Sequence, residues 1–258
     1  MKDTTVTFLL PVDSQPDLVN VDGDKIMLWK KEDHKTAAQY VHQFNQCALF
    51  IDRKESIDYI AEHFDSSGMQ RQVMINGLMD RFYSIRQIAL RFWKKNAAIM
   101  NADEEKIIYT IAQKDKHQPT RALAIDVLAK KNGKFYEAFF KKCTSDSSYS
   151  VAGAALEALL TVNPNAAIAM ENNLKQDADG RLKASLSIIT YVNRDESQAD
   201  SVVAEYKRMT IFDKVTTLKP ISYFLAKIKD ADKFKKAAGE IFDFEGMAVF
   251  VKAFTLRS

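Results

Sequence analysis

The sequence predicts a mostly α-helical protein, in which antiparallel helix pairs stack into a solenoid behind a short N-terminal β segment. Apolar residues recur at helical spacing over most of the chain after residue 35. Only 5 Pro and 8 Gly occur in 258 residues, which favours long helices joined by short loops. The helices also resemble one another at a regular interval, which is typical of repeat proteins. At 47% hydrophobic residues, a chain of this length can bury a sizeable core.

Residues 1–31 are expected to form three strands. Residues 4–10 largely alternate between apolar and polar positions, as in a half-buried strand. Two short apolar runs, 18–21 and 26–29, flank Asp22-Gly23-Asp24, which favours a hairpin turn. The Asp and Asn residues here lack EF-hand spacing, so we interpret them as turn formers rather than calcium ligands.

The helical part repeats. Segments align at Arg86, Arg121, Ala152 and Arg181, at separations of 35, 31 and 29 residues. Another segment of helical period precedes each later one, so the unit is a helix pair. Helix pairs at a period near 30 indicate an α-solenoid of the HEAT kind. Small residues on these helices would let successive inner helices approach closely: Ala89, Ala124, Ala155 and Ala184.

These observations divide the chain at residue 36. Thr36 and Gln39 fit a capping box, which predicts the start of the first helix. Because a hairpin cannot bury its own apolar face, we interpret residues 1–35 as the terminal strands of a truncated β-sandwich domain. Residues 36–258 are predicted to be a HEAT-like helical repeat domain. Its last helix, residues 247–256, is expected to cover the open end of the stack.

Motifs for catalysis, metal binding or nucleotide binding are missing from the sequence. The four histidines form no HExxH or i, i+4 pair, and there is no GxSxG, P-loop or GxGxxG. Cys47 and Cys143 lack zinc-site spacing and are interpreted as free thiols. We therefore expect this chain to be no enzyme by itself and to hold no metal or cofactor. Neither a signal peptide nor an apolar run long enough to span a bilayer is seen.

The charge balance gives little support for nucleic acid or a membrane as a partner, since the chain has 37 basic and 34 acidic residues. The basic and aromatic run at residues 91–95 is better explained by core aromatics at a solvated helix end than by base stacking. Arg86, Arg121 and Arg181 recur at one register. In helical repeats such arginines more often tie neighbouring repeats together than bind a ligand.

The run PDLVNVDGDKIMLWKKEDHKTAAQYVHQF at residues 16–44, followed by residues 50–56, resembles a junction late in bacterial aminopeptidase N-like zinc metallopeptidases. In that family a small β-sandwich domain ends in such a hairpin and the chain enters a superhelical C-terminal domain. The resemblance implies that this chain is the non-catalytic C-terminal domain of a zinc aminopeptidase, which caps the active-site chamber and restricts substrate access.

Its partners would then be the parent's own catalytic and β-sandwich domains, and the zinc would belong to the catalytic domain. Some family members hold the substrate carboxylate with a basic residue of this domain, for which Arg86 and Arg121 are the candidates here. The alternative is a free-standing HEAT-repeat scaffold for a protein partner. A nucleic-acid-binding repeat protein is a third possibility, and the near-neutral charge argues against it.

Overall fold

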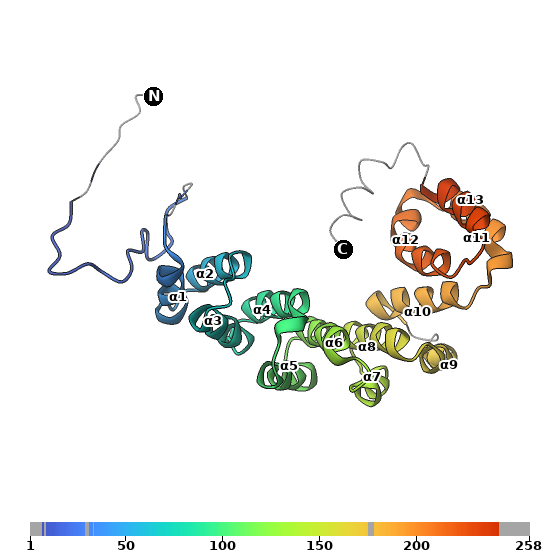
Figure 1. Ribbon diagram of the computed structural model, residues 1–258, viewed down its shortest axis with the longest axis horizontal. Coiled ribbons are helices and arrows are strands. Elements are labelled where there is room, and N and C mark those ends of the chain that lie inside the picture. Colours follow the sequence, from blue (N-terminus) through green and yellow to red (C-terminus); the bar gives the residue numbers. More distant parts are fainter. Residues whose placement is uncertain (1–6, 8, 29–30, 33, 175–177, 243–258) are drawn as a thin grey trace, which may run out of the picture. The chain divides into compact units, whose positions relative to one another are not determined.

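The computed structural model describes residues 7–242 apart from residues 8, 29–30, 33 and 175–177 (Figure 1). These residues form thirteen α-helices and two short 3-10 helices, and no strand is found among them. The chain divides into two compact units, Met1–Asn96 and Ala97–Ser258. No helix within the described ranges is long and apolar enough to cross a bilayer.

The first unit contains two helix pairs. Helix α1 (Ala37–Gln46) packs on α2 (Phe50–Glu62), α3 (Gly68–Leu78) packs on α4 (Tyr83–Lys95), and α2 packs on α4. The expected capping box is present, because the Thr36 hydroxyl accepts from the Gln39 amide at 3.3 Å and the Gln39 side chain accepts from the Thr36 amide at 2.8 Å. The predicted start of the helical part is therefore confirmed.

The second unit continues the same alternation (Figure 1). An inner row is formed by α6, α8, α10 and α12, each packed on the next, and a further helix precedes each member of this row. The bounds are α5 Ala102–Lys114, α6 Gln118–Asn132, α7 Glu137–Cys143, α8 Tyr149–Val162, α9 Pro164–Leu174, α10 Gly180–Val192, α11 Ala199–Arg208, α12 Ile211–Leu225 and α13 Ala231–Phe242, with 3-10 helices at Ala97–Ile99 and Glu196–Gln198. The predicted solenoid of helix pairs is confirmed, and the aligned positions Arg121, Ala152 and Arg181 all lie in its inner row.

Helices α8 and α10 approach each other closely at Gly153. A Cβ atom on Gly153 would lie 2.6 Å from the carbonyl carbon of Arg181 and 2.7 Å from the amide nitrogen of Leu182. These are backbone atoms and cannot move aside without shifting the helix. The Ser185 hydroxyl also donates to the Gly153 carbonyl oxygen at 3.1 Å. The inner row therefore needs a residue without a side chain at this position.

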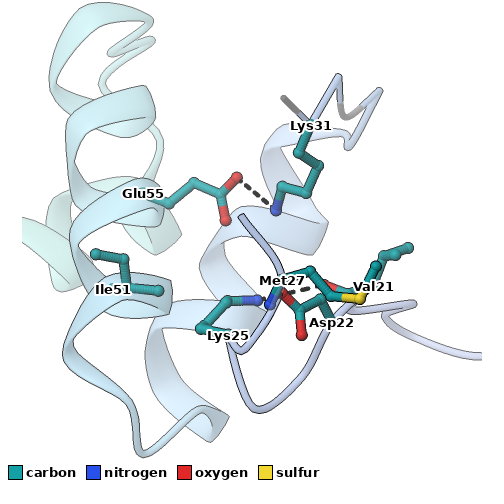
Figure 2. A pocket seen from close by; sticks show the side chains of 7 residues that line it. All are labelled: Val21, Asp22, Lys25, Met27, Lys31, Ile51 and Glu55. Atoms are coloured by element: carbon teal, nitrogen blue, oxygen red, sulfur yellow. Dashed lines mark hydrogen bonds and ion pairs between the residues drawn. The ribbon is translucent and has the colours of Figure 1, made fainter. Parts of the chain in front are cut away.

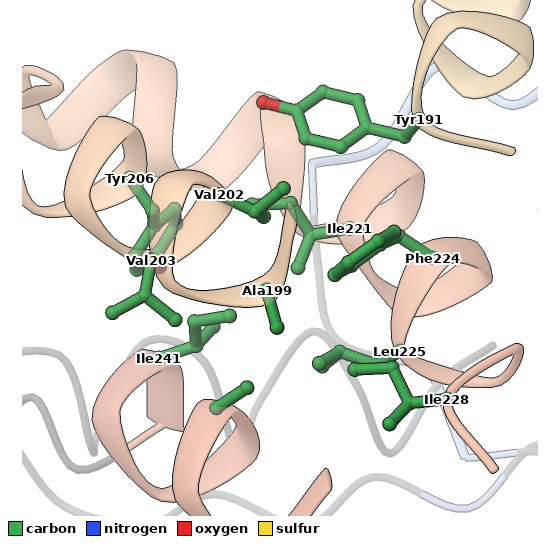
Figure 3. Close-up of a cluster of buried hydrophobic side chains, with 11 residues drawn as sticks. Tyr191, Ala199, Val202, Val203, Tyr206, Ile221, Phe224, Leu225, Ile228 and Ile241 are labelled. Atoms are coloured by element: carbon green, nitrogen blue, oxygen red, sulfur yellow. The ribbon is translucent and has the colours of Figure 1, made fainter. Parts of the chain in front are cut away.

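The last three helices enclose a separate apolar cluster (Figure 3). Ile221, Phe224 and Leu225 of α12 meet side chains of α11 and α13, and Tyr191 of α10 joins the cluster. The members are Tyr191, Ala199, Val202, Val203, Tyr206, Ile221, Phe224, Leu225, Ile228, Ala237 and Ile241. The repeat pattern fades after residue 197, but the packing of helix on helix continues through α13.

The N-terminal segment differs from the expected strands. The turn at Asp22–Lys25 is present: the Lys25 amide donates to the Asp22 carbonyl oxygen at 2.9 Å, and the Asp22 carboxylate accepts from the Ile26 and Met27 amides. No ladder flanks this turn, because the described residues around it attach to α2 through side chains and not through backbone pairing.

Three expectations from the sequence are not tested by these residues. Most of the strand expected at 4–10 and the whole helix expected at 247–256 lie outside the described residues. The assignment of residues 1–35 to a truncated sandwich domain, separate from residues 36–258, also stays a prediction.

Candidate functional site

A hollow of about 560 Å³ lies in the second unit between α5 and α7. Four aromatic rings dominate its lining, and we call them the aromatic cluster: Tyr109, Phe135, Tyr136 and Phe139. The remaining lining residues are Ala102, Glu105, Lys106, Asn132 and Ala138. Aromatic side chains offer a large contact area at low conformational cost, and they are enriched where proteins bind one another.

Two ring pairs of the aromatic cluster meet at steep angles. The Tyr109 and Phe139 rings are 5.0 Å apart between centroids at 72°, and the Phe135 and Tyr136 rings are 4.9 Å apart at 86°. Such edge-to-face contacts are favourable and hold each ring in one orientation. The Phe135 side chain is nevertheless 73% exposed. A large apolar ring thus lies at the surface in edge-to-face contact with a buried one.

The short turn from α6 to α7 explains this arrangement. The amide of Phe135 donates to the Asn132 carbonyl oxygen and the amide of Tyr136 to that of Gly133, at 3.0 and 3.1 Å. These bonds place two consecutive aromatic residues in a tight turn, with Tyr136 buried and Phe135 outside. The turn is anchored by Lys131, whose ammonium group donates to the Met100 carbonyl oxygen at 2.7 Å.

Tyr136 is fixed by one hydrogen bond at the base of the hollow. Its hydroxyl donates to the Glu105 carboxylate at 2.9 Å. Burial raises the pKa of Tyr136, and the hydrogen bond to Glu105 raises it further. The hydroxyl therefore stays a neutral donor at physiological pH, and the Glu105 carboxylate is held toward α7. This polar contact orients the aromatic cluster without exposing a reactive group.

A second hollow, of about 400 Å³, lies in the first unit where the N-terminal segment meets α2 (Figure 2). Lys25 forms an ion pair with the buried Asp52 at 2.8 Å, and Lys31 reaches Glu55 at 2.8 Å. Burial opposes the charge of Glu55, but hydrogen bonds from Lys31 and Gln43 outweigh it and lower its pKa. These ion pairs, Lys25 with Asp52 and Lys31 with Glu55, hold the N-terminal segment to α2.

The two arginines singled out from the sequence line neither hollow. In α4, the Arg86 guanidinium donates to the carbonyl oxygens of Asp80 and Arg81, at 2.8 and 3.2 Å. In α6, Arg121 donates to the Ala112 carbonyl oxygen at 3.1 Å and to the Asp146 carboxylate at 2.7 Å. Arg121 thus ties α5 and the loop before α8 to α6. A contact of either arginine with a substrate carboxylate is not tested by these contacts.

The acidic partners of two arginines, Arg121 and Arg53, were not predicted from the sequence. Asp146 accepts from Arg121 and also from the Ser148 amide at 3.0 Å, just before α8. Asp80 has the same two roles before α4, accepting from Arg53 at 2.8 Å and from the Phe82 amide at 2.7 Å. The signal was an Asp two residues before three helix caps, at Asp80, Asp115 and Asp146 before α4, α6 and α8.

We predict that Asp146→Ala lowers the free energy of unfolding by about 2 kcal/mol, because it removes a charged hydrogen bond and leaves Arg121 without this partner in a mostly buried site. Asp200→Ala is the matched control, since the Lys236–Asp200 pair is exposed and such pairs contribute at most about 1 kcal/mol. Urea denaturation of both variants checks this prediction. Equal losses would mean that the Arg121–Asp146 tie contributes no more than a surface pair.

Arg181 extends the ties along the inner row. It donates to Asp126 of α6 at 2.7 Å and lies 3.4 Å from Glu157 of α8, and Lys219 of α12 reaches the same Glu157 at 2.7 Å. Burial disfavours the Glu157 carboxylate, but Arg181 and Lys219 together lower its pKa.

No group of three His, Cys, Asp or Glu side chains in the described part of the chain could hold a metal ion.

Comparison with known proteins supports the fold. The structure is similar to a chain in the solved complex of CpcE and CpcF of phycocyanin lyase from Nostoc sp. PCC7120, with a TM-score of 0.54 and 12% identity. The match covers 84% of this chain and 97% of that chain. No protein-family model matches the sequence, and no curated protein matches it. The protein is thus a HEAT-like helical repeat protein in its fold.

The resemblance to aminopeptidase N-like metallopeptidases is therefore wrong. The similar solved chain belongs to a phycocyanin lyase complex, and no sequence match to an aminopeptidase is found. The interpretation of this chain as a domain that caps a peptidase chamber is therefore also wrong. The same holds for the expectation that its partners are the catalytic and β-sandwich domains of an aminopeptidase. The resemblance was based on residues 16–44 and 50–56, whose structural signals are a turn at Asp22–Lys25 and a capped helix start at Thr36. Both are local features that turn and cap chemistry produces in unrelated folds.

Proposed function

We propose that this chain is a free-standing helical repeat scaffold that binds a protein partner through the aromatic cluster. The observation that carries the proposal is the Phe135 ring, 73% exposed and held by edge-to-face contact beside a hollow. Aromatic residues, Phe included, are enriched at protein interfaces, and interface hot spots cluster in well-packed pockets. The proposed role is binding alone, without a catalytic step or a cofactor.

The surroundings of the aromatic cluster fit a protein partner. The hollow combines an aromatic floor with a rim of Glu105, Lys106 and Asn132, and interfaces typically place polar groups around an apolar centre. The similar solved chain comes from a complex of two proteins, CpcE and CpcF, which is consistent with an interaction role for this fold. A bound segment with one apolar side chain could insert it between Phe135 and Phe139.

Site-specific crosslinking tests this proposal. The photoreactive residue benzoylphenylalanine replaces Phe135 in one variant and Phe234, an exposed aromatic of α13, in a control. Both variants are irradiated in the source cells. We expect a discrete adduct with one protein at position 135 that is absent at position 234. The adduct should also disappear when Tyr109→Ala and Phe139→Ala are added. The same adducts at both positions, or none at 135, would contradict the proposal.

A further inference from the structure

The acidic side chains beside the aromatic cluster are engaged by other groups of the same chain. The Glu105 carboxylate accepts from the Tyr136 hydroxyl at 2.9 Å. On α7, the Glu137 carboxylate pairs with Lys134 at 2.5 Å and accepts from the Asn163 side-chain amide at 2.6 Å. The hydrogen bonds from Lys134 and Asn163 lower the pKa of Glu137, so its negative charge is already balanced within the chain.

Two lysines of the same surface have no acidic partner. Lys106 of α5 lines the hollow, and Lys142 lies in the last turn of α7. Lys142 follows Ala138 by four residues and Phe139 by three, so it shares the side of α7 that lines the hollow. Both lysines are exposed, and neither pairs with a carboxylate among the residues that the structure describes.

The two lysines lie on opposite sides of the aromatic cluster. The hydrogen bond at the base of the hollow joins α5 to the start of α7. One turn further along each helix, the Tyr109 ring contacts the Phe139 ring at 5.0 Å, so the two helices run in the same direction. Lys106 lies one turn before Tyr109, and Lys142 lies one turn after Phe139. Roughly two turns, or about 11 Å, therefore separate the two lysines along the helices.

The surface is therefore apolar in its centre and positive at both ends. Glu105 is the one carboxylate of the lining and offsets a single positive charge. A cationic segment would be repelled at both ends, whereas an acidic segment would be attracted, and such complementarity selects among protein partners. Nucleic acid also combines with rings and lysines, but its affinity depends on neutralising many phosphates. Two unpaired lysines therefore favour an acidic protein segment.

We propose that the partner presents an acidic segment to the aromatic cluster, with an apolar side chain in the hollow and carboxylates that pair with Lys106 and Lys142. This inference rests on the proposed function, because it specifies the partner of the same site. The rings of Phe135 and Phe139 provide the apolar contact area. The two lysines exclude basic segments and set the position of the acidic one along α5 and α7.

Fluorescence anisotropy with two labelled peptides tests the charge preference. One peptide carries a central phenylalanine flanked by aspartates, and the other has lysines in place of the aspartates. Each peptide is titrated against the full chain and against the double variant Lys106→Glu with Lys142→Glu. The double variant Lys183→Glu with Lys235→Glu is the matched control, since these lysines are exposed on α10 and α13, do not line the hollow and change the net charge equally.

We expect the native chain to bind the aspartate peptide roughly tenfold more tightly than the lysine peptide, because exposed ion pairs replace like-charge contacts. The preference should reverse in the variant of Lys106 and Lys142 and persist in the control variant. It should also become smaller as the salt concentration rises, since salt screens exposed charges.

Several results would overturn the acidic partner. They are equal binding of the two peptides by the native chain, a preference that both double variants retain, and no binding of either peptide. Tighter binding of a labelled oligothymidine than of the aspartate peptide would assign the surface to nucleic acid instead. Phe135→Ser separates this inference from the proposed function. If it weakens peptide binding while the lysine variants do not change the preference, the site stands without its acidic partner; if it changes nothing, the proposed function fails as well.

Discussion

Replacement of Gly153 by valine is expected to lower the free energy of unfolding by about 3 kcal/mol. A Cβ atom at this position would lie 2.6 and 2.7 Å from backbone atoms of Arg181 and Leu182, so α8 and α10 must separate to admit any side chain. Overpacking of this kind costs about 1–3 kcal/mol of folding stability. The cost should lie at the upper end of this range, because the branched valine side chain would press against backbone atoms. The helix propensity gained on replacing glycine, less than about 1 kcal/mol, offsets only part of the loss.

Gly239→Val is the matched control for this expectation. Gly239 lies within α13, and a Cβ atom there would meet no atom within 4 Å. The same substitution should therefore change stability by less than about 0.5 kcal/mol. Urea unfolding followed by circular dichroism measures both variants. A loss at position 153 no larger than that at position 239 would show that α8 and α10 do not depend on this close approach.

Replacement of Phe224 by alanine is expected to cost about 3–5 kcal/mol. The side chain is 1% exposed and sits within the cluster of α10 to α13, so its removal takes away a large buried area and leaves a cavity. Tyr223→Ala, at the neighbouring and 39% exposed position, should cost less than about 1 kcal/mol.

Hydrogen exchange adds a spatial readout to the Phe224 prediction. In repeat proteins stability is largely local to a repeat and its neighbours. Amides of α11 to α13 should therefore lose protection in Phe224→Ala while those of α6 and α8 keep it. A uniform loss of protection across the second unit would mean that these helices unfold as one cooperative body, contrary to this expectation.

The fold could be predicted largely from local signals. Helical period, the cap at Thr36 and the recurring register of Arg121, Ala152 and Arg181 are all properties of short sequence windows, and the structure confirms them. The expected strands were wrong for residues 18–28 because short apolar runs beside a turn signal do not by themselves specify a strand. A ladder also needs a partner strand, and the described residues around the turn contact α2 instead.

The aromatic cluster could not be predicted in the same way. Phe135, Tyr136 and Phe139 are close in sequence, but Tyr109 comes from α5, two helices before α7, and its ring meets the rings of Tyr136 and Phe139 only in the folded chain. The partner of Arg121 was missed for a similar reason, since Asp146 lies 25 residues further along the chain. Contacts between repeats are set by packing, and a single sequence contains no direct record of them.

The central claim is that a protein partner binds at the aromatic cluster, and the dissociation constant of the crosslinked partner tests it most directly. The purified partner is titrated against the native chain, Phe135→Ser and Phe234→Ser. Loss of a hot-spot aromatic costs about 2 kcal/mol or more, which corresponds to roughly 30-fold weaker binding. We predict that loss for Phe135→Ser and unchanged affinity for Phe234→Ser. Equal affinity of all three chains would contradict the claim.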